Sequence, residues 1–185
     1  MTNETWNTIF AGGTFVVIAA TAVAALIQLR HLRAGNQLNT LLTLMRMWDQ
    51  PDMQEHIRYM RGPLQEKLKD PAFLAEFAEG KLSRIEHPEL LIADFWEQIG
   101  AFMKYSLMDE GSWLDVACTQ VISAWESLAP AIEAMRSTRG RAQFDNFEYA
   151  AVRGKLWAQS HPDGYYPKGT PRMDQLRQKA QESPQ

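Results

Sequence analysis

The sequence predicts an all-α protein in which one N-terminal transmembrane helix continues into a cytoplasmic helical bundle of about five helices. Residues 5–29 contain no charged side chain, and this apolar run is long enough to cross a membrane as a helix. Apolar residues then recur at helical spacing, without the alternation typical of strands. We therefore expect an anchor with a basic flank (1–33), a helical domain (34–160) and a flexible polar tail (161–185).

The flanks of the apolar run predict its orientation. Trp6 lies where an interfacial aromatic residue is expected, and Arg30, His31 and Arg33 follow the run on its other side. Positive residues stay in the cytoplasm, so the N-terminus should face out. A cleaved signal peptide is an alternative, since residues 22–24 resemble a cleavage site, but its positive charge would precede the apolar core. A buried helix is the other alternative, although such a helix rarely lacks all charge.

The span is expected to continue into the cytoplasm as a helix with an apolar stripe. The stripe consists of Leu38, Leu41, Leu42, Met45 and Trp48. It predicts either the first face of the domain core or a short parallel coiled coil between two anchors, so Leu38, Leu41, Met45 and Trp48 are candidate interaction residues. Gly35 is a weak point where this helix could hinge. Small residues inside the span, such as Ala20 and Ala24, would permit close helix packing.

Prolines and caps place the remaining helices. We expect helices at about 51–69, bent or split at Gly62, and at 71–79, capped by Asp70 and ended by Gly80. The helix over 88–108 has the broadest apolar face, and the next one is expected to be capped by Ser112. Cys118 falls in the apolar stripe of that helix and should be a small buried hydrophobe. A last helix covers about 143–160.

The net charge of −3 conceals an asymmetry. Residues 52–135 carry 7 basic and 15 acidic side chains, whereas residues 136–179 carry 9 basic and 4 acidic ones. This pattern makes Arg136, Arg139 and Arg141 candidate interaction residues. They could form a solvated face, contact the anionic inner leaflet or bind nucleic acid. We expect no nucleic-acid partner, because the chain is acidic overall and no binding motif accompanies these residues.

Motifs for catalysis are not found in the sequence. The one cysteine excludes an intramolecular disulfide, and the four histidines are scattered without metal-ligand spacing. The Glu-x-x-His pattern of di-metal bundles does not occur, and no nucleophile elbow or phosphate-binding glycine loop is found. Glu86, His87 and Glu89 are interpreted as a solvated, acidic helix N-terminus. We therefore expect no catalytic, cofactor or metal site, no small-molecule substrate and no enzyme activity.

Several runs resemble an uncharacterised bacterial family of small membrane-anchored proteins, classed as a domain of unknown function. These runs are ALIQLRHLRAGNQLNTLLTLMRMW, HIRYMRGPLQEKLKDP, HPELLIADFWEQIGAFMKYSLMDEGSWLD and NFEYAAVRGKLWAQSHPDG. The resemblance covers about residues 25–172. It implies a bacterial inner-membrane protein with a helical cytoplasmic domain, and it implies no reaction. The architecture is also similar to that of phage abortive-infection membrane proteins, by analogy alone.

The expected function is that of a non-enzymatic, single-pass inner-membrane protein. Its partners would be the lipid bilayer and a protein, either a different chain or a second copy, as in an accessory subunit of a membrane complex. The alternative is a membrane-associated effector of phage defence or stress that acts on an intracellular target.

Overall fold

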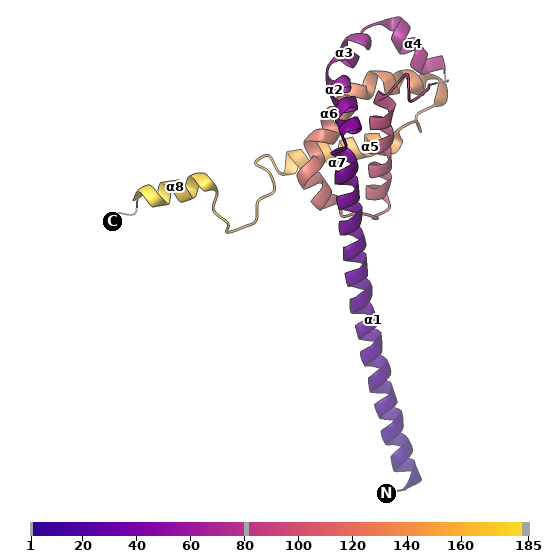
Figure 1. Ribbon diagram of the computed structural model, residues 1–185. Coiled ribbons are helices and arrows are strands. Elements are labelled where there is room, and N and C mark those ends of the chain that lie inside the picture. Colours follow the sequence, from indigo (N-terminus) through magenta and orange to yellow (C-terminus); the bar gives the residue numbers. More distant parts are fainter. Residues whose placement is uncertain (1, 80–81, 183–185) are drawn as a thin grey trace.

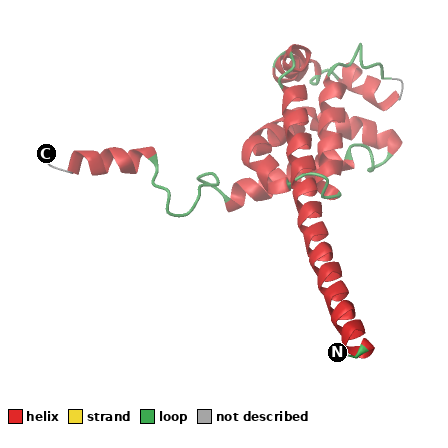
Figure 2. Cartoon of the chain, turned by 60° about the horizontal axis from the view of Figure 1, so that its bottom comes forward, coloured by secondary structure: helices red, strands yellow, loops and turns green. Residues whose placement is uncertain are grey.

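The computed structural model describes residues 2–79 and 82–182, and these residues form helices and loops without strands (Figures 1 and 2). The all-α class is confirmed. The helices are α1 (Asn3–Trp48), α2 (Pro51–Arg61), α3 (Pro63–Lys67), α4 (Pro71–Glu79), α5 (Glu89–Lys104), α6 (Glu110–Arg139), α7 (Asp145–Ser160) and α8 (Met173–Glu182).

Helix α1 is much longer than the others and projects from the bundle (Figure 1). Its 46 residues span about 69 Å at the usual helical rise. The helix runs through Gly35 without interruption, so the expected weak point is not a break. The apolar side chains that the structure describes in its N-terminal half are exposed, Phe15 by 72%. By length and composition, α1 is long and apolar enough to span a membrane.

Helices α2–α7 form the bundle, so its described residues hold six helices where about five were expected. The extra helix arises at Gly62, which separates α2 from α3. Pro63 then begins α3, because a proline needs no hydrogen-bond acceptor for its nitrogen in a first helical turn. The predicted cap of α4 is confirmed: the Ala72 amide donates to Asp70 Oδ1 at 2.9 Å. The predicted end of that helix at Gly80 lies outside the described residues.

The predicted cap of α6 is wrong. Asp109 is the capping residue, and its Oδ1 accepts hydrogen bonds from the Ser112 amide at 2.8 Å and the Ser112 hydroxyl at 2.6 Å. The Asp109 carboxylate, directly before the first turn, therefore caps α6, and Ser112 donates to this carboxylate. Cys118 is half-buried against the core rather than fully enclosed.

Helix α5 lies at the centre of the core. Trp96, fully buried on α5, stacks on Phe147 of α7 with ring centroids 6.3 Å apart. A Cβ at Gly100 would lie 1.9 Å from the carbonyl oxygen of Asn146, so the two backbones approach closely there. The Glu97 carboxylate accepts hydrogen bonds from the Phe147 amide and the Asn146 side chain, each at 2.8 Å. Glu97 thus caps α7 from a neighbouring helix.

The tail contains a helix that the sequence did not predict. Helix α8 lies within 161–185, where we expected a flexible polar segment. It stands away from the bundle (Figure 1), with Met173 67% exposed and Leu176 44% exposed. The flexibility of residues 161–185 stays a prediction.

Candidate functional site

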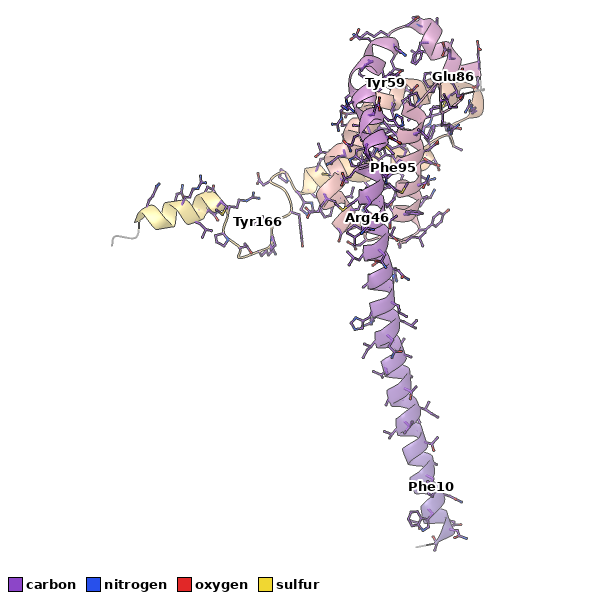
Figure 3. All side chains as sticks on the ribbon, in the orientation of Figure 1. Phe10, Arg46, Tyr59, Glu86, Phe95 and Tyr166 are labelled. Carbon is purple, nitrogen blue, oxygen red and sulfur yellow. The ribbon has the colours of Figure 1, made fainter. Side chains whose placement is uncertain are left out.

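An acidic cleft lies at the end of the bundle that is farther from the N-terminus of α1. Its volume is about 550 Å³. Figure 3 shows Glu86 and Tyr59 at this end and Arg46 at the opposite end, where α1 joins the bundle. We define the acidic cleft by its lining residues, which are Lys67, Phe73, Glu76, Glu79, Leu82, Glu86 and His87.

A buried histidine–carboxylate pair forms one wall of the acidic cleft. Glu89 is fully buried and His87 is 5% exposed, and His87 Nδ1 lies 2.9 Å from Glu89 Oε1. The other ring nitrogen, Nε2, lies 3.3 Å from Glu76 Oε2 at the edge of the cleft. The rings of Phe73 and Phe77 cover the imidazole, with centroids 5.6 and 4.7 Å away. The predicted solvated N-terminus is therefore wrong for His87 and Glu89, because α4 folds over them.

The geometry of this pair is that of a carboxylate that orients an imidazole. Such a pair can serve as a general base when the free nitrogen faces a substrate. Here Nε2 faces Glu76, so the three side chains connect α4 to the start of α5. Among the described residues, no group of three or more His, Cys, Asp or Glu side chains is arranged to hold a metal ion.

The loop before α5 presents a strongly exposed isoleucine beside the acidic cleft. Ile85 is 93% exposed. The preceding Arg84 donates to both Asp94 oxygens, at 3.0 and 3.1 Å, and these hydrogen bonds raise the pKa of Arg84 above its usual value. The Ile85 amide donates to Ser83 Oγ at 3.2 Å. The turn is thus held to α5 while its apolar tip faces solvent.

The predicted apolar stripe of α1 separates into two faces. Leu41 and Trp48 are half-buried, and the Trp48 ring lies 5.2 Å from Phe95 and 5.1 Å from Trp96. Leu44, which the stripe did not include, is the buried residue of this segment at 3% exposure. Leu38, Leu42 and Met45 are exposed by 55%, 43% and 39%, and we call these three residues the free face of α1.

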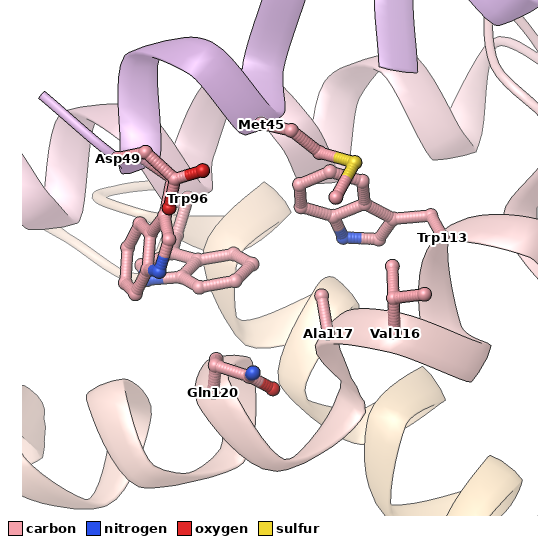
Figure 4. Close-up of a pocket in the computed structure, with 8 residues that line it drawn as sticks. Met45, Asp49, Trp96, Trp113, Val116, Ala117 and Gln120 are labelled. Carbon is pink, nitrogen blue, oxygen red and sulfur yellow. The ribbon is translucent and has the colours of Figure 1, made fainter. Parts of the chain in front are cut away.

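A groove between α1 and α6 borders the free face of α1. Its volume is about 210 Å³. Met45 lies on one side and Val116, itself 50% exposed, lies on the other, with Trp96 and Trp113 in the lining (Figure 4). Met45 belongs both to the free face of α1 and to this groove, whose lining also includes the polar Asp49 and Gln120.

The predicted basic residues do not lie with the free face of α1. Arg136 is used inside the domain: it pairs with Glu148 at 2.8 Å and donates to the Gln143 carbonyl at 2.9 Å. Arg139 and Arg141 are exposed at the C-terminal end of α6, where Thr138 donates to the Ala78 carbonyl of α4. Helix α4 lies at the far end of the bundle from the N-terminus of α1 (Figure 1), so Arg139 and Arg141 lie at the end of the bundle opposite the projecting part of α1.

The predicted membrane-flank residues all lie on α1 outside the bundle. Trp6 is 48% exposed and stacks on Phe10 with ring centroids 6.0 Å apart. Arg30, His31 and Arg33 are exposed on the stretch between the apolar half and the bundle. This placement separates an aromatic end from a basic end along one helix.

The sequence pattern of a family described as a domain of unknown function, DUF4760, matches residues 15–153. The chain belongs to this family. The DUF4760 match begins inside the apolar half of α1 and ends in α7, so it treats the projecting helix and the bundle as one unit and leaves out α8. Neither a curated protein nor a solved structure matches the chain.

Proposed function

We propose that this DUF4760 protein is a non-enzymatic, single-pass protein of a bacterial inner membrane. Its N-terminus faces out, and its cytoplasmic bundle acts through protein–protein contacts, as an accessory subunit of a membrane complex does. The observation that carries the proposal is the continuity of α1, whose bare apolar half leads without a break into Leu44 in the bundle core. A rigid connection of this kind holds the domain at a fixed distance from the bilayer.

Two further observations support the proposal. Arg30 and Arg33 follow the apolar half of α1, which favours a cytoplasmic bundle. The DUF4760 match includes much of the apolar half, which favours a permanent anchor over a cleaved leader. The contact surfaces offered to a protein are the free face of α1 and the acidic cleft with Ile85 beside it.

The test combines membrane extraction with a topology measurement on the full chain. We expect the protein to stay in membranes through an alkaline carbonate wash and a C-terminal tag to resist protease in intact spheroplasts. Gentle detergent extraction should then yield a stoichiometric protein complex. Release by the carbonate wash, or digestion of the tag in intact spheroplasts, would overturn the anchor. Purification as a lone monomer would overturn the role in protein contacts.

A further inference from the structure

The free face of α1 continues the spacing of a much longer stripe. Leu38, Leu42 and Met45 follow one another at intervals of four and three residues. The same alternation extends toward the N-terminus through Thr21, Ala24, Gln28, His31 and Gly35. A repeat of three and four residues keeps one side of a helix facing a parallel neighbour over its whole length. The stripe therefore runs from inside the apolar half to the bundle.

The chemistry of this stripe changes with the medium expected around it. Thr21, Ala24 and Gln28 are small or polar, and such residues promote helix association in lipid, where larger apolar side chains gain little by leaving the acyl chains. Leu38, Leu42 and Met45 lie beyond the apolar half, where burial of apolar surface away from water stabilises association. Each part of the stripe thus has the residue type that would drive association in its own surroundings.

The arginines of the basic flank lie away from the stripe, whereas His31 lies on it. Arg30 and Arg33 follow Gln28 by two and five residues, which places them on the opposite side of the helix. Two parallel copies could therefore approach along the stripe without bringing these charges together. Arg46 borders the stripe, and Asp49 follows three residues later with the opposite charge. The bundle leaves Leu38, Leu42 and Met45 exposed by 55%, 43% and 39%, and α6 borders two of them: Leu38 and Met45 each line a groove beside that helix.

We infer that a second copy of this chain covers the free face of α1, so that two α1 helices pair in parallel along residues 21–45. This inference rests on the proposed membrane anchor, because anchoring gives both copies one direction and one depth. Under those constraints each residue of the stripe meets its own counterpart, and the interface is self-complementary about a two-fold axis. The groove beside Met45, with Val116 on its far side, widens the surface that the partner covers.

The test uses two neighbouring methionines as a matched pair. Met45 lies on the free face and is 39% exposed, whereas Met47 is 41% exposed on another side of the same helix. Cys118 is the one native cysteine and is first replaced by alanine. Met45→Cys and Met47→Cys are then oxidised with copper phenanthroline in membranes and separated on a non-reducing gel. A disulfide requires Cα atoms within about 7 Å. We therefore expect a disulfide-linked dimer band for Met45→Cys and no such band for Met47→Cys, because only position 45 faces the second copy.

A second substitution separates specific pairing from chance collision. Leu42→Glu places like charges opposite each other on the free face and should abolish the Met45→Cys dimer, whereas Met47→Glu should leave it in place. Equal cross-linking at both methionines, or none at Met45→Cys, would overturn the pairing. Such a result in a protein that resists carbonate extraction and keeps a protein companion would leave the proposed function intact. Release of the protein by the carbonate wash would instead overturn the proposed membrane anchor.

Discussion

The apolar half of α1 and the bundle are built from the same residue types, but only the bundle encloses them. Helix α5 buries nine of its sixteen residues, including Ile92, Trp96 and Ile99. The most apolar stretch of α1 buries none. Such an extended apolar surface is unfavourable in water, whereas lipid accepts it without a packing partner. Under the proposed function, the apolar half of α1 depends on lipid and the bundle depends on its own packing, so each region should respond to its own kind of substitution.

The largest effect is expected from a substitution that disrupts the bundle alone. His87→Ala leaves the fully buried Glu89 without its imidazole partner, and breaking a buried pair in this way costs about 3–5 kcal/mol. We expect the free energy of unfolding to fall by this amount in urea titrations of the full chain in detergent micelles. Extraction from membranes should not change, because the substitution leaves α1 intact.

Glu76→Ala is the matched control for His87→Ala. Glu76 contacts the same imidazole, but its side chain is 55% exposed, so its loss should cost less than about 1 kcal/mol. Equal losses for the two variants would contradict the assignment of the buried pair as the main connection between α4 and α5.

Two exposed isoleucines, one on α1 and one on the bundle, test which region requires the membrane. Ile18 on α1 is 62% exposed and Ile85 on the bundle is 93% exposed. An arginine at the centre of a spanning helix disfavours insertion by about 2.5–3.5 kcal/mol, so Ile18→Arg should increase the fraction released by alkaline carbonate. Ile85→Arg should leave the fraction of protein released by alkaline carbonate unchanged, because the Ile85 side chain already faces water. Equal retention of both variants would show that the bilayer does not surround Ile18.

The sequence predicted the elements that depend on local signals and missed those that depend on distant ones. Pro51 and Asp70 indicate helix starts through their own backbone chemistry, and the structure has helices there. The burial of Glu89 depends on where α4 lies, which no neighbouring residue encodes. The choice of Leu44 over Leu42 as the core residue of α1 depends in the same way on the position of the bundle.

Capping shows the same limit at a smaller scale. Glu97 of α5 accepts a hydrogen bond from the Phe147 amide at the start of α7, although the two residues are 50 positions apart in the sequence. The sequence predicted Ser112 as the cap of α6, but the backbone conformation makes Asp109 the capping residue. The predicted basic surface is divided because distant residues decide which arginine is paired. Arg136 pairs with Glu148, while Arg139 and Arg141 remain exposed.

The smallest predicted effect lies at the junction of the two regions, where Asp109 and Ser112 of α6 line a groove with Leu38 of α1. Asp109→Ala removes the cap and should lower the free energy of unfolding by about 1 kcal/mol, whereas Asp109→Asn keeps a capping oxygen and should change it little.

The hydrogen bonds from the Ser112 side chain and amide lower the pKa of Asp109. A lowered folded-state pKa means that the ionised cap stabilises the protein above the unfolded pKa of about 3.9 and loses this contribution as the pH falls through the folded value. The stability of the wild type relative to Asp109→Asn should therefore be greater at about pH 7 than at about pH 3, and a constant difference would contradict the ionised cap.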